Sequence, residues 1–172
     1  MHRKACVAAT LLVAALASPA LAAEYSGTLS EPGVVWISDG SRRPPAIELQ
    51  MKNLHKTFVP GVLVIPAGSD VRFPNEDPFF HSIYSESAPD TFDLGFYDTG
   101  PGKVVPFANA GVIDVRCHIH GLMRATIVVV DGPAITVDKA GERYTLTNVR
   151  RGRHTLHVWT VAGGEQTSKI RL

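Results

Sequence analysis

Short apolar or alternating runs, separated by turn residues, follow one another along most of the 172-residue chain. The runs lie at 34–38, 46–51, 62–65, 71–73, 81–84, 104–107, 112–116, 124–130, 144–146, 155–161 and 168–172. Turns such as Asp39-Gly40 and Asp131-Gly132 separate them, as such dipeptides separate strands in β proteins. Beyond residue 22, no stretch keeps a helical apolar period long enough to predict a helix. The pattern therefore predicts an all-β fold, either a sandwich or a Greek-key barrel.

Residues 1–22 have a different pattern. Arg3 and Lys4 precede an apolar stretch that ends in Ala20-Leu21-Ala22, which is typical of a secretory signal with its cleavage site. The stretch is too short and wrongly flanked to span a membrane. We therefore expect residues 1–22 to be a signal peptide, and the mature protein to be exported and periplasmic.

The charge balance excludes one large class of partner. The chain has 17 Lys+Arg against 16 Asp+Glu, and loss of the signal peptide leaves it close to neutral. Without a basic run to neutralise phosphates, nucleic-acid binding is not expected.

The acidic residues Glu76 and Asp77, like Asp93 and Asp98, are explained better as solvated loop residues than as catalytic pairs.

The exported chain keeps a single cysteine, Cys117, because Cys6 leaves with the signal peptide. A lone thiol in an oxidising compartment needs a reason. Intermolecular pairing, an inert buried thiol and metal ligation are the alternatives, and a nucleophile with His120 as its base is a weaker one, because no oxyanion hole is evident.

Metal ligation accounts for the neighbours of this cysteine. Cys117, His120 and Met123 follow one another at C-x2-H-x2-M in one short loop, and His81 begins an apolar run 36 residues earlier. Thiolate and thioether favour Cu(I), imidazole is acceptable to Cu(II), and a trigonal His2Cys site with a weak axial Met suits both. Structural zinc prefers stronger donors than a thioether. The set therefore predicts one copper ion that exchanges single electrons.

The segment 68–81, GSDVRFPNEDPFFH, joined to the C-x2-H-x2-M loop, resembles the plastocyanin/amicyanin-type cupredoxins. Together with FDLGFY at 92–97 and the terminal H-T-L-x-V-W at 154–159, it is most similar to bacterial exported proteins labelled methylamine utilisation proteins. The resemblance implies a Greek-key β-sandwich with one type 1 copper. It implies four ligands, namely His81, Cys117, His120 and Met123, the last of them axial.

Two positions depart from this family. Ser82 stands where these proteins usually have an Asn that helps to tie the two ligand loops together, and Gly121 stands where Pro often follows the second His. Neither change removes a ligand. They bear on the rigidity and the reduction potential of the site.

Two parts of the chain differ in composition. Residues 46–131 hold the phenylalanines and most of the prolines, and form the expected cupredoxin domain. The segment 132–172 is too small to support a core alone. Its G-x-x-Y-x-L-x-N-V pattern is similar to the closing half of carboxypeptidase regulatory-like modules, so we expect 24–45 and 132–172 to pair as a small β appendage.

The expected function is outer-sphere electron transfer to a redox protein partner, and no substrate is transformed, so an enzyme is not expected. By analogy with cupredoxins, the electron passes through the edge of His120, and the partner docks around Leu122, Pro78 and Phe79. Two alternatives are copper storage or delivery with the same ligands, and a metal-free interaction module.

The remaining histidines are expected to have no part in the site. Strand alternation points His118 away from Cys117, toward solvent. His55, His154 and His157 are interpreted in the same way, the last two on opposite faces of one strand.

Overall fold

The computed structural model describes residues 22–40 and 45–172. The expected signal peptide, apart from Ala22, lies outside the described residues. Within them the chain forms strands and no helix, so the predicted all-β class is confirmed. Among the same residues, no helix long and apolar enough to cross a membrane is found.

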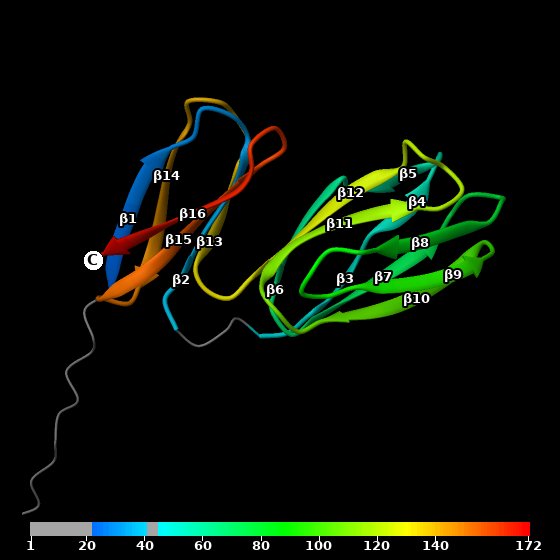
Figure 1. Cartoon of the computed structure of the whole chain (residues 1–172), viewed down its shortest axis with the longest axis horizontal. Coiled ribbons are helices and arrows are strands. Elements are labelled where there is room, and N and C mark those ends of the chain that lie inside the picture. Colours follow the sequence, from blue (N-terminus) through cyan, green and yellow to red (C-terminus); the bar gives the residue numbers. More distant parts are fainter. Residues whose placement is uncertain (1–21, 41–44) are drawn as a thin grey trace, which may run out of the picture.

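The strands form two groups that lie side by side (Figure 1). The larger group consists of β3 (Glu48–Gln50), β4 (Lys52–Leu54), β5 (Thr57–Val59), β6 (Val62–Pro66), β7 (Ser69–Asn75), β8 (His81–Ser85), β9 (Phe92–Tyr97), β10 (Gly100–Phe107), β11 (Gly111–Cys117) and β12 (Arg124–Val130). The smaller group consists of β1 (Ala23–Thr28), β2 (Gly33–Ser38), β13 (Ala134–Val137), β14 (Arg143–Val149), β15 (Arg153–Thr160) and β16 (Gly164–Arg171).

The larger group is a sandwich of two five-stranded sheets. One has the order β10-β7-β4-β5 with β3 also paired to β7, and the other has the order β6-β12-β11-β8-β9. Alternate side chains from both sheets meet in one buried cluster that includes Phe73, Phe107, Ile113 and Ile127. This is the arrangement of a sandwich whose two inner faces interdigitate.

The smaller group joins the two ends of the described chain. β1 pairs with β14, and β2 pairs with β13 and β15 in the four-stranded order β13-β2-β15-β16. Its own core contains Val35, Ile37, Leu146 and Leu156. None of the described strand pairings links this group to the larger one. The likeness to carboxypeptidase regulatory-like modules stays a prediction.

A third buried cluster joins the two groups. It contains Val34 and Trp36 of β2, Val128 and Val130 of β12, and Trp159 of β15. The alternate residues of β2 and β12 point into the two separate cores. Both strands are therefore buried on both faces, which is why each reads as a nearly continuous apolar run.

The junction and the candidate ligands lie at opposite ends of β12. The strand begins at Arg124, directly after the C-x2-H-x2-M loop, and ends at Val130 beside the smaller group. In Figure 1 this loop is the turn between β11 and β12 at the end of the larger sandwich away from β2 and β13. The smaller group therefore leaves the surface around the ligand loop open.

Candidate metal centre

Strand pairing brings the ligand candidates together at one end of the sandwich. β8 begins at His81 and β11 ends at Cys117, and the two strands are antiparallel neighbours, with Cys117 opposite Ile83. The N–H of His118 donates to the carbonyl of Ser82 at 2.9 Å, which extends the pairing beyond the strand end. His81 and Cys117 thus meet although they are far apart in the sequence.

Three of the four predicted ligands form one compact group. The Sγ atom of Cys117 lies 3.7 Å from Nδ1 of His81 and 3.8 Å from Nδ1 of His120. All three ligand atoms lie within 4.8 Å of one another. His81 and Cys117 are 0% and 4% exposed, and His120 is half-buried. Solvent therefore reaches the group from the His120 side.

The spacing fits a metal ion held by three ligands. With metal–sulfur and metal–nitrogen distances of about 2.3 and 2.0 Å, trigonal bonding places sulfur and nitrogen about 3.7 Å apart. That is the separation between Cys117 and each histidine. One soft sulfur and two imidazoles suit copper, whose redox site in proteins is a trigonal His2Cys set. The residues present therefore fit the ion that the sequence predicts.

Met123 lies at the base of the same loop. It is 1% exposed, packs in the cluster that contains Cys117, and donates its backbone N–H to the carbonyl of His120 at 2.8 Å. This hydrogen bond closes the loop into a turn before β12 begins. Met123 thus ends the turn that contains His120, and its coordination is part of the proposal below.

The two departures from the family pattern have different consequences. Ser82 is buried, and its backbone carbonyl accepts the His118 N–H, so a main-chain hydrogen bond joins the two ligand segments here. Gly121 is exposed, and a Cβ atom added there would meet nothing within 4 Å. The loop therefore does not need glycine at this position for reasons of space.

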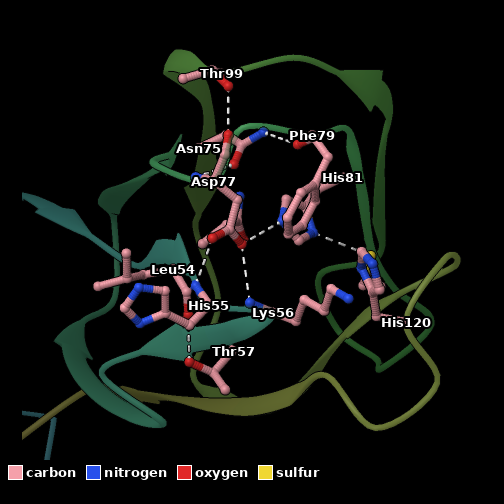
Figure 2. A network of polar contacts seen from close by, with 12 residues as sticks. Leu54, His55, Lys56, Thr57, Asn75, Asp77, Phe79, His81, Thr99 and His120 are labelled. Atoms are coloured by element: carbon pink, nitrogen blue, oxygen red, sulfur yellow. Dashed lines mark hydrogen bonds and ion pairs between the residues drawn. The ribbon is translucent and has the colours of Figure 1, made fainter.

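A buried carboxylate contacts the ring nitrogen of His81 that does not face Cys117. Asp77 is 2% exposed, and its Oδ2 atom lies 2.9 Å from Nε2 of His81 (Figure 2). The backbone N–H groups of His55 and Lys56 donate to the same carboxylate at 2.6 and 3.0 Å. Burial on its own raises the pKa of Asp77, but the Lys56 N–H, the His81 ring and the His55 N–H outweigh it and lower that pKa.

The interpretation of Asp77 as a solvated loop residue is therefore wrong. Its neighbour Glu76 is exposed and pairs with Lys52 at 2.7 Å, as a solvated acid would. The two residues look alike in the sequence. The difference arises because the β4–β5 turn, which lies beside the end of β7 in the same sheet, covers Asp77 with two N–H donors.

The loop around Asp77 is also tied to its surroundings (Figure 2). Asn75 accepts the N–H of Asp77 at 3.0 Å and donates to the carbonyl of Phe79 at 2.8 Å. The hydroxyl of Thr99 donates to the carbonyl of Asp77. The segment that leads into His81 is thus hydrogen-bonded along its length.

The half-buried His120 has a lowered pKa. Burial, followed by the nearby His81 ring and the Lys56 ammonium, lowers the pKa of His120. Its imidazole therefore keeps a free lone pair to somewhat lower pH than an ordinary histidine. Only a neutral imidazole nitrogen can ligate a metal.

Several apolar side chains that are close in sequence to His81 or His120 are exposed. Leu122 is fully exposed, Phe80 and Ile119 are 55% and 43% exposed, and Phe79 is half-buried. The Phe79 ring lies 5.7 Å from the His120 ring, between centroids. Sequence reasoning named Leu122 and Phe79, and missed Phe80 and Ile119.

His118 lies on the other side of Cys117, where strand alternation places it. It is 46% exposed, and its ring stacks on Tyr84 with centroids 3.8 Å apart. Its Nε2 atom is 3.5 Å from Asp93. It is not part of the ligand group.

A second polar cluster has the order of a hydrolytic triad but not its chemistry. His157 lies 3.0 Å from the hydroxyl of Ser38 and 2.8 Å from Glu165. The hydroxyl donates its proton to Asp131 at 2.6 Å. Because that proton is already committed to a carboxylate, His157 does not activate Ser38 as a nucleophile. The cluster ties β2, β15 and β16 to the residue that follows β12.

Comparison with known proteins adds likenesses to solved structures. No protein-family model and no curated protein matches this chain. A copper-containing nitrite reductase (NirK) from Thermus scotoductus SA-01 is 22% identical over 56% of this chain, with a TM-score of 0.47, and this chain covers 27% of its length. At such identity, a likeness concerns the fold alone.

Two smaller proteins are matched over nearly their whole length. A single-site mutant of amicyanin in its reduced state is 18% identical, with 61% of this chain and 98% of that chain covered and a TM-score of 0.44. A purple cupredoxin from Nitrosopumilus maritimus is 23% identical, with 48% and 99% covered and a TM-score of 0.40. The closer likeness to exported methylamine utilisation proteins stays a prediction.

Proposed function

We propose that the chain is an exported type 1 copper protein that carries single electrons between redox partners. The observation that carries this proposal is the buried His81–Cys117–His120 group, whose spacing and donor atoms suit copper. When bound, copper supplies a one-electron couple between Cu(I) and Cu(II). His81, Cys117 and His120 are the proposed equatorial ligands, and Met123 is the proposed axial one.

The chain's own contribution is to hold this set still. His81 and Cys117 stand at the ends of paired strands, so their separation is fixed by the sheet rather than by a mobile loop. A ligand set that is rigid on packed strands needs little rearrangement when its charge changes. The low exposure of His81, Cys117 and Met123 keeps water away from the ion.

The proposed electron path leaves through the edge of His120, the one half-exposed member of the group. The apolar side chains of Leu122, Pro78 and Phe79 around it form the proposed docking surface for a redox protein partner. Such partners meet through small, weak interfaces. No substrate is transformed in this proposal, so the protein is not an enzyme. Export to the periplasm follows from the signal peptide expected at residues 1–22.

Storage or delivery of copper is the second candidate for the same ligands. Burial supports the carrier, because a delivery protein must expose its ligands to the recipient, whereas His81 and Cys117 are almost completely covered. A metal-free interaction module would not explain why three metal-binding side chains converge.

Repeated redox cycling tests the proposal. The copper-loaded protein is reduced and reoxidised many times with small mediators in the presence of a Cu(I) chelator. A carrier returns to the same absorption spectrum after each cycle and loses no copper to the chelator. Rapid loss of copper in the reduced state would indicate delivery instead.

A further inference from the structure

Asp77 is a buried acidic residue to which the proposed electron transfer assigns no role. We propose that Asp77 is a positioning residue for the metal centre, which aims Nδ1 of His81 at the ion and favours Cu(II) over Cu(I). The inference rests on the copper function proposed above. It gives this chain a determinant of reduction potential outside the four ligands.

The first step concerns the orientation of the His81 ring. An ionised carboxylate can only accept hydrogen bonds, so the 2.9 Å contact with Asp77 requires that Nε2 of His81 carry the proton. The lone pair is then on Nδ1, the atom that faces Cys117 at 3.7 Å. A hydrogen bond at the outer nitrogen of a ligating histidine fixes both its tautomer and its ring orientation.

The second step concerns what holds the carboxylate itself. β4 and β5 are joined by the two-residue turn His55–Lys56, in which both residues have positive φ, at 54° and 59°. This is the backbone of a type I′ hairpin turn. In this turn both N–H groups point at Asp77. The sheet that contains β4 and β5 therefore fixes the carboxylate. Through Asp77 it also fixes His81, which belongs to the other sheet.

The third step concerns charge. Asp77 and His81 are both at most 2% exposed, so water screens the interaction between them weakly. The ammonium of Lys56 lies over the Phe79 ring, 5.4 Å from its centroid. A negative charge in contact with a ligand stabilises the ion of higher positive charge. Asp77 therefore lowers the reduction potential of the site.

The test compares Asp77→Asn with Glu76→Gln. Both variants remove one negative charge from adjacent positions, but Glu76 is exposed and bound to Lys52, away from His81. Asp77→Asn removes the charge and one of the two acceptor oxygens, and mutation of such an outer partner of a ligating histidine lowers metal affinity by about 10- to 100-fold. We expect Asp77→Asn to lose Cu(II) affinity by such a factor, to lose less Cu(I) affinity, and to have a higher reduction potential. Glu76→Gln is expected to stay close to the wild type.

A measurement on the wild type keeps the test independent of how well the variant folds. In the diamagnetic Cu(I) protein, the Nε2 proton of His81 is expected to give a sharp resonance protected from exchange with water. Absence of that resonance would overturn the inference, as would equal potentials for Asp77→Asn and Glu76→Gln. A wild type that binds no copper as a coloured thiolate complex would instead remove the proposed function itself.

Discussion

At the scale of single residues, Met123 combines two roles that a substitution can separate. Its side chain is buried in the core, and its thioether is the proposed axial ligand. Met123→Leu keeps nearly the same volume, so the free energy of unfolding of the apo-protein should fall by less than about 1.5 kcal/mol. Because the axial ligand tunes a blue-copper potential, voltammetry should show a higher potential. An unchanged potential would mean that Met123 is only part of the core.

The β4–β5 turn carries strain that can be relieved. His55 has a positive φ, which asparagine adopts more easily than most side chains do. His55→Asn keeps the N–H that binds Asp77 and, because type I′ turns favour asparagine, should raise the free energy of unfolding by about 0.5 kcal/mol or less. Chemical denaturation measures this change. His154→Asn, in the regular strand β15, is the control and should give no increase; equal gains would contradict the strain argument.

A site residue could be predicted from the sequence where the residues that explain its role lie close to it in the chain. Cys117, His120 and Met123 share one short loop, so their spacing alone suggested a common ion. His81 needed only one partner strand. Asp77 was missed because its burial comes from a turn 21 and 22 residues earlier in the chain, and that turn contains no glycine to mark it in the sequence.

At the scale of elements, the β7–β10 pair depends on a close backbone approach. Gly102 of β10 has φ of 70°, and a Cβ atom there would lie 1.7 Å from the carbonyl oxygen of Phe73. Gly102→Ala must push the two strands apart and should lower the melting temperature sharply. Gly95→Ala, with φ of 60° and open space around it, isolates the backbone strain. Similar losses in both variants would show that the contact is unimportant.

The strands that were predicted correctly are those with a strong pattern of their own. β12 and the centre of β2 are continuous apolar runs because both of their faces are buried. β4 and β5 were missed because each has three residues and only one buried side chain. The run predicted at 46–51 ends in the structure at Gln50, and β4 continues after Met51, which is buried.

At the scale of the whole molecule, the two strand groups share the buried junction around Trp36. This side chain is 1% exposed and stacks on His157, with ring centroids 4.6 Å apart. Trp36→Ala should cost about 3–5 kcal/mol, since it leaves a large cavity in a packed interface. Phe96→Ala removes a side chain that is 71% exposed and should cost about 0.5 kcal/mol or less. Comparable losses would contradict a packed junction.

Because the junction lies at the end of β12 away from the ligands, Trp36→Ala should leave the copper centre intact where the protein folds. The absorption spectrum of the copper-loaded variant checks this. A changed spectrum in the folded variant would mean that the two ends of the larger sandwich are coupled.

The most direct test of a type 1 copper centre is the visible absorption spectrum of the mature protein with one equivalent of Cu(II). We predict an intense thiolate-to-copper band that is lost in Cys117→Ser and kept in His118→Ala, whose side chain is adjacent but lies outside the ligand group. A wild type that stays colourless, or that binds copper only as a pale complex unaffected by Cys117→Ser, would contradict the account.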